Sequence, residues 1–368
     1  MSQAAALAPS QRRSVQLIPA DRTGDALAIT TRQVPGLPVA DGETEAVNLI
    51  RDIFEWARGA TPASPTSFDI TGPIFSRPYS RIYRIDFVNS RRSLAAKICL
   101  EKKSPDVEFA RRQYDDVRLL FERMKSNPRY RIPEAIALIA DHATILMEWL
   151  DAEPLLELLA RRQICSRKLL ECVTEAGAWL RHFHRLGPSR TVVASESMLQ
   201  TELDRVRKTI HRERVESPAI TAAMSALEAA TPAVCGIRIE HCRLHGDFQP
   251  GNVMFSGTAV YGLDMSWPNE GPALNDAAHM LNNIQRLSKM PKGFHLAPFL
   301  GRLEQAFERG YFGEIGYDTG RALAWFRALD NVQFLARHFH HVRTPLHGWY
   351  LGRMQSTSIS KSLNRVAS

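Results

Sequence analysis

The residues best suited to chemistry are two carboxylates and an amide that follow one another along a short stretch of the chain. Asp247 follows His245-Gly246, Asn252 comes five residues later, and Asp264 comes twelve residues after Asn252. Phosphoryl transfer needs one carboxylate to orient the attacking hydroxyl and accept its proton, and further oxygens to hold magnesium against the phosphates. In that order, Asp247 would be the base, and Asn252 and Asp264 the metal ligands.

Two short apolar runs, residues 252–255 and 259–263, predict a hairpin that positions the metal ligands. Both runs are rich in β-forming residues, and a Ser-Gly-Thr spacer separates them. A hairpin brings its outer ends together, so Asn252 and Asp264 should lie side by side. Mg²⁺ accepts such a site, because it takes a few protein oxygens and leaves its other positions to water and phosphate. The preceding stretch, 244–251, contains two glycines and a proline and should be a constrained loop.

A second hairpin is predicted from residues 81–88 and 93–100, which flank a polar turn. With a period of two, Lys97 points away from the larger apolar face of its strand. That face holds Leu94, Ala96, Ile98 and Leu100. A lysine in this position can reach nucleotide phosphates. The alternative is an ordinary solvated strand lysine, because lysines are mostly exposed; the downstream Asp247 motif favours the first interpretation.

Together these motifs resemble those of the aminoglycoside phosphotransferase and choline kinase-like family, distant relatives of the eukaryotic-type protein kinases. The family's loop has the form His-Gly-Asp, four residues and Asn, which His245 to Asn252 match. The resemblance covers roughly residues 70–345. It implies an α+β, two-lobed protein kinase-like fold, with a small antiparallel-sheet N-terminal lobe and a mainly helical C-terminal lobe. It also implies ATP and Mg²⁺ as cofactors.

The resemblance gives the catalytic loop and its surroundings their roles. By the motif match, Asp247 would be the catalytic base, and Asn252 and Asp264 the magnesium ligands. Residues 271–278 resemble the family's segment after the metal-binding Asp, with Asp276 as a structural support. His184 ends a helix that resembles one below the active site, and we interpret it as a packing residue.

The resemblance also assigns nucleotide contacts in the N-terminal lobe. Residues 143–150 resemble the hinge strand, where backbone groups near Glu148 and Leu150 would bind adenine. The segment before the first hairpin strand lacks a glycine-rich signature. Small-molecule kinases of this kind often have a Ser-containing loop there, which makes Ser80 and Arg81 candidate phosphate contacts.

One departure from the family concerns Lys97, which the resemblance places at the α- and β-phosphates. The family pairs this lysine with a Glu on the following helix, but the predicted helix 109–124 has Gln113 at that place. Glutamine cannot form the ion pair. Glu108 and Asp116 lie on the same segment and could substitute. The departure keeps open the alternative of a nucleotide-binding pseudoenzyme or interaction module.

The composition fits a soluble, cytoplasmic enzyme. A chain of 368 residues with 44% hydrophobic content can bury large cores. Its five cysteines are an odd number and form no Cys-x-x-Cys pair, which indicates free thiols in a reducing compartment and argues against structural zinc. No apolar run approaches the roughly 18 residues of a membrane span. We also expect no secretory signal.

The formal net charge of +8 raises the question of nucleic-acid binding. The arginine pairs are scattered along the chain, however, and no recognised nucleic-acid module accompanies them. We therefore expect solvated basic faces that help to attract anionic ATP. The expected partner is a small-molecule acceptor and not nucleic acid, and a basic chain fits a polycationic acceptor poorly. The sequence does not indicate an oligomeric state.

The predicted organisation is a kinase-like fold preceded by an extension. Residues 1–41 should be a disordered N-terminal extension, and 42–150 a nucleotide-binding N-terminal lobe with an extra helix. Residues 151–345 should be a helical C-terminal lobe with the catalytic loop and acceptor site, and 346–368 a C-terminal tail. Helical patterning within the second lobe covers residues 155–163, 168–186, 199–215, 299–310 and 319–338.

The residues and the resemblance together predict an ATP- and Mg²⁺-dependent kinase that phosphorylates a hydroxyl of a small molecule. One alternative keeps the fold but makes the acceptor a glycan or lipid-linked sugar, as in sugar kinases of bacterial envelope pathways. The pseudoenzyme remains a second alternative. A protein kinase is disfavoured, because the sequence has no His-Arg-Asp loop and no Asp-Phe-Gly or Ala-Pro-Glu segment.

Overall fold

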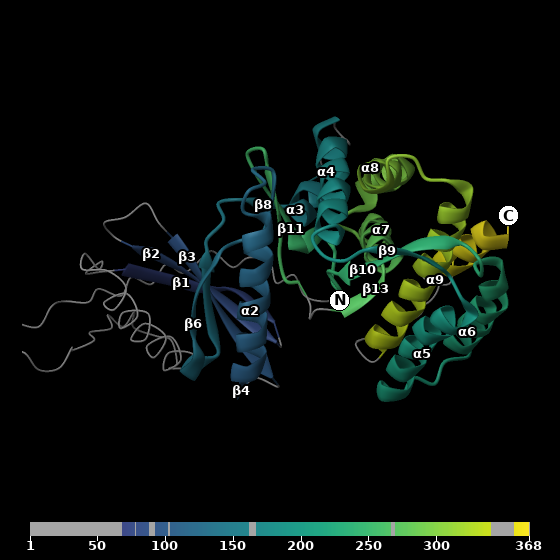
Figure 1. Ribbon diagram of the computed structural model, residues 1–368, viewed down its shortest axis with the longest axis horizontal. Helices are drawn as coiled ribbons and strands as arrows, with labels where there is room; N and C mark the ends of the chain where they lie inside the picture. Colours follow the sequence, from purple (N-terminus) through teal and green to yellow (C-terminus); the bar gives the residue numbers. More distant parts are fainter. Residues whose placement is uncertain are drawn as a thin grey trace, which may run out of the picture. The chain divides into compact units, whose positions relative to one another are not determined.

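The computed structural model describes residues 68–77, 79–87, 93–101, 104–161, 167–265, 269–339 and 357–367. Contacts within the chain divide it into two compact units (Figure 1). The smaller unit contains the described residues up to Glu122, together with Pro133–Asp151. The larger unit contains Arg123–Ile132 and the described residues from Ala152 onward. The predicted N-terminal extension and the helix after it lie outside the described residues.

An antiparallel sheet forms the smaller unit, as the fold prediction implied. Its strand order is β1-β2-β3-β7-β6, and a short strand β4 pairs with β3. The strands are β1 (Phe68–Arg77), β2 (Ser80–Phe87), β3 (Ser93–Glu101), β4 (Ser104–Pro105), β6 (Ala135–Ile139) and β7 (Thr144–Glu148), with a 3₁₀ turn, η1 (Ala140–His142), between the last two. The predicted β2–β3 hairpin is confirmed by their pairing, and its turn lies outside the described residues.

Side chains alternate between the two faces of β3, as predicted, and the two faces pack against different parts of the unit. Leu94, Ala96, Ile98 and Leu100 are buried in one apolar cluster with residues of β1, β2, β6 and β7. Helix α2 (Val107–Met124) covers the opposite face, since the Cys99 thiol contacts the Gln113 side chain at 3.5 Å. The strand β1 was not predicted, and its end occupies part of the segment interpreted as a phosphate-binding loop.

The larger unit is mainly helical, as predicted. Its helices are α3 (Leu155–Ala160), α4 (Arg167–His184), α5 (Glu196–Arg212), α6 (Pro218–Ala230), α7 (Leu274–Ser288), α8 (Leu300–Phe312) and α9 (Tyr317–His338), with 3₁₀ turns η2 (Thr231–Ala233), η3 (Pro250–Asn252) and η4 (Phe294–Phe299). Five of them correspond to the predicted helices, whereas α6 and α7 were not predicted. Residues 357–367, part of the predicted tail, are helical, and Ile359 and Val366 are buried.

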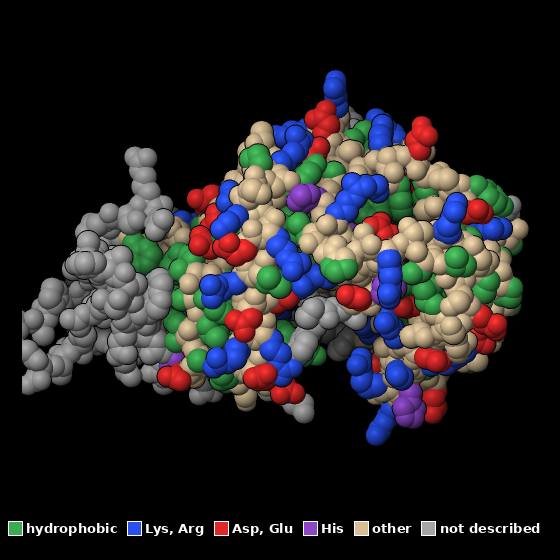
Figure 2. Space-filling view, in the orientation of Figure 1, with side chains coloured by type: hydrophobic (Ala, Val, Ile, Leu, Met, Phe, Trp, Pro, Cys, Tyr) green, Lys and Arg blue, Asp and Glu red, His purple; other side chains and the backbone are tan. Residues whose placement is uncertain are grey.

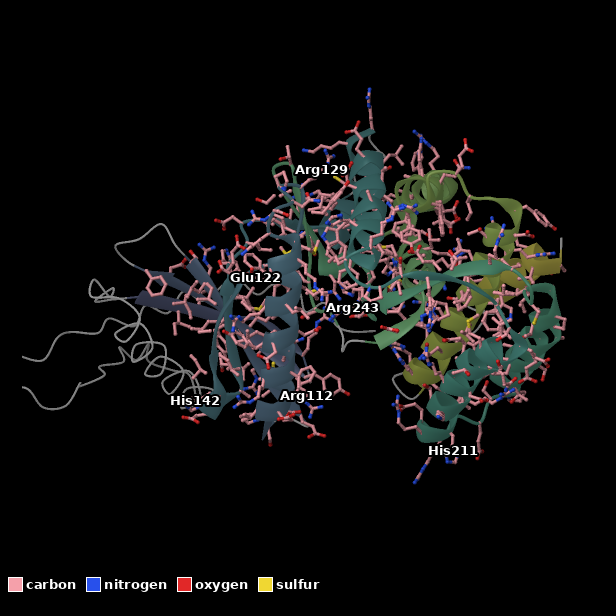
Figure 3. The ribbon with its side chains drawn as sticks, in the orientation of Figure 1. Arg112, Glu122, Arg129, His142, His211 and Arg243 are labelled. Carbon is pink, nitrogen blue, oxygen red and sulfur yellow. The ribbon has the colours of Figure 1, made fainter. Side chains whose placement is uncertain are left out.

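Two small sheets complete the larger unit. One has the order β13-β10-β9, formed by β9 (Arg190–Val193), β10 (Arg238–Leu244) and β13 (Asn269–Pro272). The other has the order β5-β12-β11-β8, formed by β5 (Tyr130–Arg131), β8 (Glu153–Pro154), β11 (Val253–Ser256) and β12 (Ala259–Gly262). Pairing of β5 with β12 joins the segment after α2 to this unit. Arg129, labelled in Figure 3, adds an ion pair to Glu175 of α4 at 2.7 Å.

Helices α4 and α8 cross with their backbones in contact, because each has a glycine at the crossing. A Cβ on Gly177 would lie 2.4 Å from the carbonyl oxygen of Phe307, and one on Gly310 would lie 1.9 Å from that of Thr174. Neither position can hold a larger residue without moving a helix. The close crossing fixes the α4 side chains, such as Trp179, that pack against the loop 244–251.

Charged side chains of both signs are interspersed over the face shown in Figure 2, and the basic ones do not gather in a single stripe there. In the part of the chain that the structure describes, no helix combines the length and apolar character needed to cross a membrane.

Candidate active site

The predicted hairpin is confirmed, and it brings the two metal-ligand candidates to one end of a β-ribbon. Strands β11 and β12 pair from Val253 with Gly262 to Ser256 with Ala259. Beyond the last pair, the Leu263 N–H donates to the carbonyl oxygen of Asn252 at 2.8 Å. Asn252 therefore lies next to the backbone that leads into Asp264.

The chain turns sharply between β12 and Asp264. A Cβ on Gly262 would lie 2.1 Å from the Trp179 ring, so this position requires glycine. Asp264 has a φ of 55°, in the left-handed region that Asp tolerates better than most residues. Residues held in this region cost energy and are concentrated at functional sites. The bend leaves the Asp264 side chain exposed at the end of the ribbon.

Asp247 is held by three side chains. Gln249 Nε2 donates to both carboxylate oxygens, at 3.0 and 2.9 Å, and Asn252 Nδ2 donates to Oδ2 at 2.9 Å. The third partner is His279, whose Nε2 lies 3.3 Å from Oδ1. The Asp247 side chain keeps 41% of its surface exposed, so it is fixed in orientation and still accessible.

These contacts keep Asp247 ionised. Burial alone would raise the pKa of Asp247, but the hydrogen bond and positive charge of His279, with the hydrogen bond from Gln249, hold that pKa below its ordinary value. A carboxylate with a low pKa is a weak base, yet it can orient a hydroxyl by accepting its hydrogen bond. Phosphoryl transfer through a loose transition state depends mainly on this positioning of the hydroxyl.

The residues at the end of the ribbon fit a magnesium ion. Asn252 uses its amide nitrogen for the carbonyl and the carboxylate of Asp247, both at 2.9 Å, which leaves the amide oxygen as its remaining ligand atom. With Asp264, this gives two hard oxygen donors. The described residues contain no group of three His, Cys, Asp or Glu side chains that could hold a metal. Water and phosphate oxygens would fill the remaining positions of the ion, as they do for Mg²⁺ in nucleotide sites.

Aromatic side chains pack against the loop 244–251. Trp179 stacks on Phe183 and on Phe248, with ring centroids 5.3 and 5.5 Å apart. The buried ring of His245 meets Phe248 edge-on at 5.2 Å, and neither of its nitrogens has a hydrogen-bond partner among the described residues. Burial lowers the pKa of His245. We therefore interpret His245 as a neutral packing residue.

Asp276 of α7 fastens the backbone of the loop. Its carboxylate accepts the N–H of His245 at 2.6 Å and that of Gly246 at 2.9 Å, and it contacts His184 Nε2 at 2.9 Å. The other nitrogen of His184 lies 2.7 Å from the Tyr311 hydroxyl. Although burial opposes ionisation, these donors hold the pKa of Asp276 below its ordinary value. The supporting role of Asp276 and the non-catalytic role of His184 agree with these contacts.

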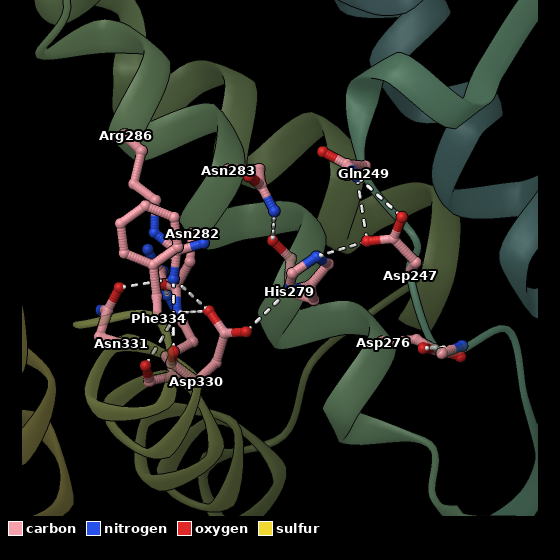
Figure 4. A network of polar contacts seen from close by, with 12 residues as sticks. Asp247, Gln249, Asp276, His279, Asn282, Asn283, Arg286, Asp330, Asn331 and Phe334 are labelled. Atoms are coloured by element: carbon pink, nitrogen blue, oxygen red, sulfur yellow. Dashed lines mark hydrogen bonds and ion pairs between the residues drawn. The ribbon is translucent and has the colours of Figure 1, made fainter. Parts of the chain in front are cut away.

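Gln249, His279 and Asp330 are contacts of the site that sequence reasoning missed. His279 lies on α7 and joins Asp247 to Asp330 of α9 (Figure 4). A signal was present in the sequence. Along the mostly buried helix α7, Asp276, His279, Asn282 and Arg286 recur every three or four positions, so they lie on one face of the helix. Such a stripe indicates a buried polar network, but not its partners.

Lys97 lies in the smaller unit and is buried, with 8% of its surface exposed. This excludes the alternative of a solvated strand lysine. Gln113 accepts a hydrogen bond from the Cys99 thiol, so it is occupied by the neighbouring residue on the same face of β3. Glu108 is exposed and forms an ion pair with Arg112 at 2.7 Å, which removes it as the substitute for the family's Glu.

The other predicted nucleotide contacts also lie in the smaller unit. Ser80 begins β2, and both Ser80 and Arg81 are half-buried residues paired with β1 and β3. Glu148 ends β7, and its N–H donates to the carbonyl oxygen of Glu134 at 2.9 Å. An adenine contact at Glu148 would therefore need another atom. The roles of these residues and of Leu150 remain predictions.

Comparison with known families gives one match. A family model described as "Phosphotransferase enzyme family" matches residues 89–323, which is more than half of the chain and includes the whole of the loop and hairpin described above. No curated protein matches the sequence.

Solved structures share the fold. A glucosamine kinase matches with a TM-score of 0.55 and 14% identity, over 96% of this chain and 88% of that chain. A choline/ethanolamine kinase family protein from Mesorhizobium loti matches with a TM-score of 0.53 and 15% identity, over 87% and 98%. An amicoumacin kinase in complex with AMP-PNP and Ca²⁺ matches with a TM-score of 0.53 and 12% identity, over 88% and 96%.

Proposed function

Because the chain belongs to the phosphotransferase enzyme family, we propose that it is a kinase that uses ATP and Mg²⁺ to phosphorylate a hydroxyl of a small molecule. The set of donors around Asp247, beside the ribbon end with Asn252 and Asp264, carries the proposal. It fixes an ionised carboxylate next to two side chains whose oxygens could bind Mg²⁺. Positioning and charge stabilisation are the main contributions that a protein makes to phosphoryl transfer.

In the proposed reaction, Asp247 accepts the hydrogen bond of the acceptor hydroxyl and aims its oxygen at the γ-phosphorus. The new O–P bond forms while the bond to the β-phosphate breaks, ADP leaves, and the hydroxyl proton passes to Asp247. Asn252 Oδ1 and Asp264 would hold Mg²⁺, and the bound ion would supply positive charge to the phosphates. Lys97 would hold the α- and β-phosphates. The AMP-PNP and Ca²⁺ of the amicoumacin kinase support the use of a nucleotide and a divalent ion.

Asp116 is the proposed partner of Lys97 in place of the family's Glu. Strand residues two apart point to the same side, so Lys97 faces α2 as Cys99 does. Helix α2 begins beside Cys99, whose carbonyl oxygen accepts the Asp106 N–H at 3.0 Å, and Gln113 meets the Cys99 thiol. Lys97 lies ~6.6 Å back along β3 from Cys99. The half-buried Asp116 lies ~4.5 Å further along α2 than Gln113. Asp116 is therefore the acidic residue of α2 that we pair with Lys97.

We expect Asp116→Asn to raise the KM for ATP or lower kcat by about tenfold, equivalent to ~1.4 kcal/mol, because the lysine loses its counter-charge. Glu108→Gln on the same helix is the matched control and should leave both constants unchanged. Steady-state kinetics with varied ATP would measure the effect. Equal constants for the two variants would contradict the assignment and would strengthen the pseudoenzyme alternative.

Asp264→Ala should weaken Mg-ATP binding by at least about tenfold, because even residues that only support metal ligands change metal affinity about 10–100-fold. Isothermal titration calorimetry with Mg-ATP would show this. In EDTA, the variant and the wild type should bind ATP equally. Asp318→Ala, which removes an exposed aspartate of α9, is the control. Unchanged Mg-ATP affinity in Asp264→Ala would remove Asp264 from the metal site.

The charges near Asp247 favour a neutral, sugar-like acceptor over a polycationic one. Helices α7 and α9, next to the proposed catalytic carboxylate, have few acidic residues, and each of these already has a partner. Asp276 contacts the loop and His184, Asp330 contacts His279, and Asp318 contacts Arg321. The sequence contains no Asp or Glu between residues 277 and 303, or after residue 330. A polycation would find no spare carboxylates on these segments. The glucosamine kinase among the structural neighbours supports a sugar acceptor with few charges, since glucosamine carries a single amino group.

The proposed function is tested by a panel of sugars, amino alcohols and aminoglycosides, each incubated with Mg-ATP and purified protein. ADP release that depends on one class of acceptor is the expected result, with Asp247→Ala as the blank. Neutral sugars should be used better than aminoglycosides. ATP binding without transfer to any acceptor would favour the pseudoenzyme, and preference for aminoglycosides would overturn the argument from charge.

A further inference from the structure

His279 is the side chain that joins the catalytic carboxylate to the rest of the larger unit. Its Nε2 lies 3.3 Å from Asp247 Oδ1, and its Nδ1 lies 2.7 Å from Asp330 Oδ1. A neutral imidazole has one donor nitrogen and one acceptor nitrogen. Both partners here are carboxylates, which only accept when ionised, so the two contacts can be satisfied together only by the doubly protonated imidazolium.

Asp330 is itself held from behind by α7. Its other oxygen, Oδ2, accepts from Asn282 Nδ2 at 2.8 Å and forms an ion pair with Arg286. Arg286 also donates to Asn331 Oδ1 at 3.0 Å and lies over the Phe334 ring at 4.0 Å (Figure 4). Asp330 and Arg286 keep only 15% and 6% of their side-chain surface exposed. The series of alternating charges from Asp247 through His279 and Asp330 therefore ends at Arg286, whose packed surroundings restrict the movement of these side chains.

We propose that His279 is a positioning residue of the phosphotransfer site, a charged imidazolium that Asp330 and Arg286 hold against Asp247 so that the catalytic carboxylate keeps its orientation and its charge. The inference rests on the proposed function for its catalytic consequence. Gln249 and Asn252 lie only two and five residues after Asp247 in the sequence, whereas His279 comes from a separate helix, α7. It therefore supplies the contact that ties the carboxylate to a rigid element.

The electrostatic surroundings agree with this role. Burial and the charge of Arg286 oppose protonation of His279, but Asp330 and Asp247 outweigh them and raise the pKa of His279 to about 9. Burial likewise opposes ionisation of Asp330, and the charges of Arg286 and His279 hold the pKa of Asp330 well below its ordinary value. The imidazolium should therefore persist at neutral pH. It should be lost, with its contribution to positioning, as the pH rises through about 9.

Nuclear magnetic resonance of ¹⁵N-histidine-labelled protein tests the charge without any substrate. The resonances of His279 are those that disappear in His279→Gln. We expect both ring nitrogens to be protonated at pH 7.5, and to titrate near 9 in the wild type but at a clearly lower pH in Asp330→Asn. A neutral His279 ring at pH 7.5 would overturn the proposal.

Kinetics test the positioning role separately from folding. His279→Gln should lower kcat by about 10–100-fold, because a small misplacement of a catalytic group can reduce the rate by about this factor. The KM for ATP should stay within about twofold of the wild-type value. We expect the wild type to lose kcat as the pH rises through about 9, and His279→Gln to lack this loss. The control is His182→Gln, which removes a half-buried histidine whose ring lies 3.3 Å from Asn127 Nδ2 and beside the Tyr130 ring, away from Asp247. It should keep the wild-type kcat and pH profile.

The outcomes distinguish this inference from the proposed function. If Asp247→Ala abolishes turnover while His279→Gln retains the wild-type kcat and alkaline limb, the positioning role of His279 is wrong and the kinase assignment stands. If no acceptor is phosphorylated by the wild type, the proposed function fails, and the titration of His279 in the resonance experiment still decides whether the imidazolium exists.

Discussion

Asp247→Ala is expected to lower kcat by about 10²–10⁴-fold, the range over which a positioned general base contributes to enzymatic rates. ATP should still bind, because the proposed nucleotide contacts lie on other residues. Asp247→Asn should lose a similar factor while it keeps the shape of the side chain. Both results follow from the loss of the ionised acceptor that Gln249, Asn252 and His279 surround. Acceptor-dependent ADP release measures kcat, and calorimetry measures ATP affinity.

Asp318→Ala is the control for that experiment, because Asp318 is exposed and contacts Arg321 near the start of α9. It should retain wild-type turnover. A melting temperature within a few degrees of wild type would show that Asp247→Asn is folded. Unchanged turnover in either Asp247 variant would remove Asp247 from its catalytic role.

Asp276→Ala should have the largest effect on stability, lowering the free energy of unfolding by about 3–5 kcal/mol, as expected when one partner of a buried ionic contact is removed. The variant leaves the N–H groups of His245 and Gly246 and the ring of His184 without their acceptor. The catalytic loop loses its anchor at the same time, so kcat should fall as well. Urea unfolding measures the first effect.

The comparison variant is Asp204→Ala, which breaks a solvent-exposed ion pair with Arg207. Its free energy of unfolding should change by no more than about 1 kcal/mol. Asp276→Asn, which keeps one acceptor oxygen, should lie between the alanine variant and the wild type. A stability loss for Asp276→Ala no larger than that for Asp204→Ala would contradict the anchoring role.

The two hairpins could be predicted because their pattern is local. Alternation along residues 93–100 fixed the face on which Lys97 lies, and a Gly-containing spacer fixed the ribbon that ends at Asn252 and Asp264. Period-two patterns and turn residues need no information from distant parts of the chain. The long amphipathic helices were predictable for the same reason.

The rest of the site depends on contacts between residues far apart in the sequence. His279 and Asp247 are separated by 32 positions and His279 and Asp330 by 51, so nothing local indicates that they meet. Helix α7 is buried nearly all round, which hides the apolar stripe that would reveal an amphipathic helix. Strand β10, which leads into the catalytic loop, was missed because its polar residues break the alternation.

Gln113 stands where the family has a Glu, and in the structure its side chain contacts Cys99. The missing Glu weakened the case for an active enzyme. In the structure, Gln113 accepts a hydrogen bond from Cys99, and Lys97 is buried on the same face of β3. A buried lysine needs a counter-charge. From its position along α2, Asp116 is the proposed source of that charge.

The most direct test of the central claim is ³¹P nuclear magnetic resonance of the wild-type protein with Mg-ATP and the best acceptor from the panel. A phosphomonoester signal should grow in step with ADP, and Asp247→Asn should give neither over the same time. ADP accompanied only by inorganic phosphate, or an equal rate of product formation by the variant, would contradict the account.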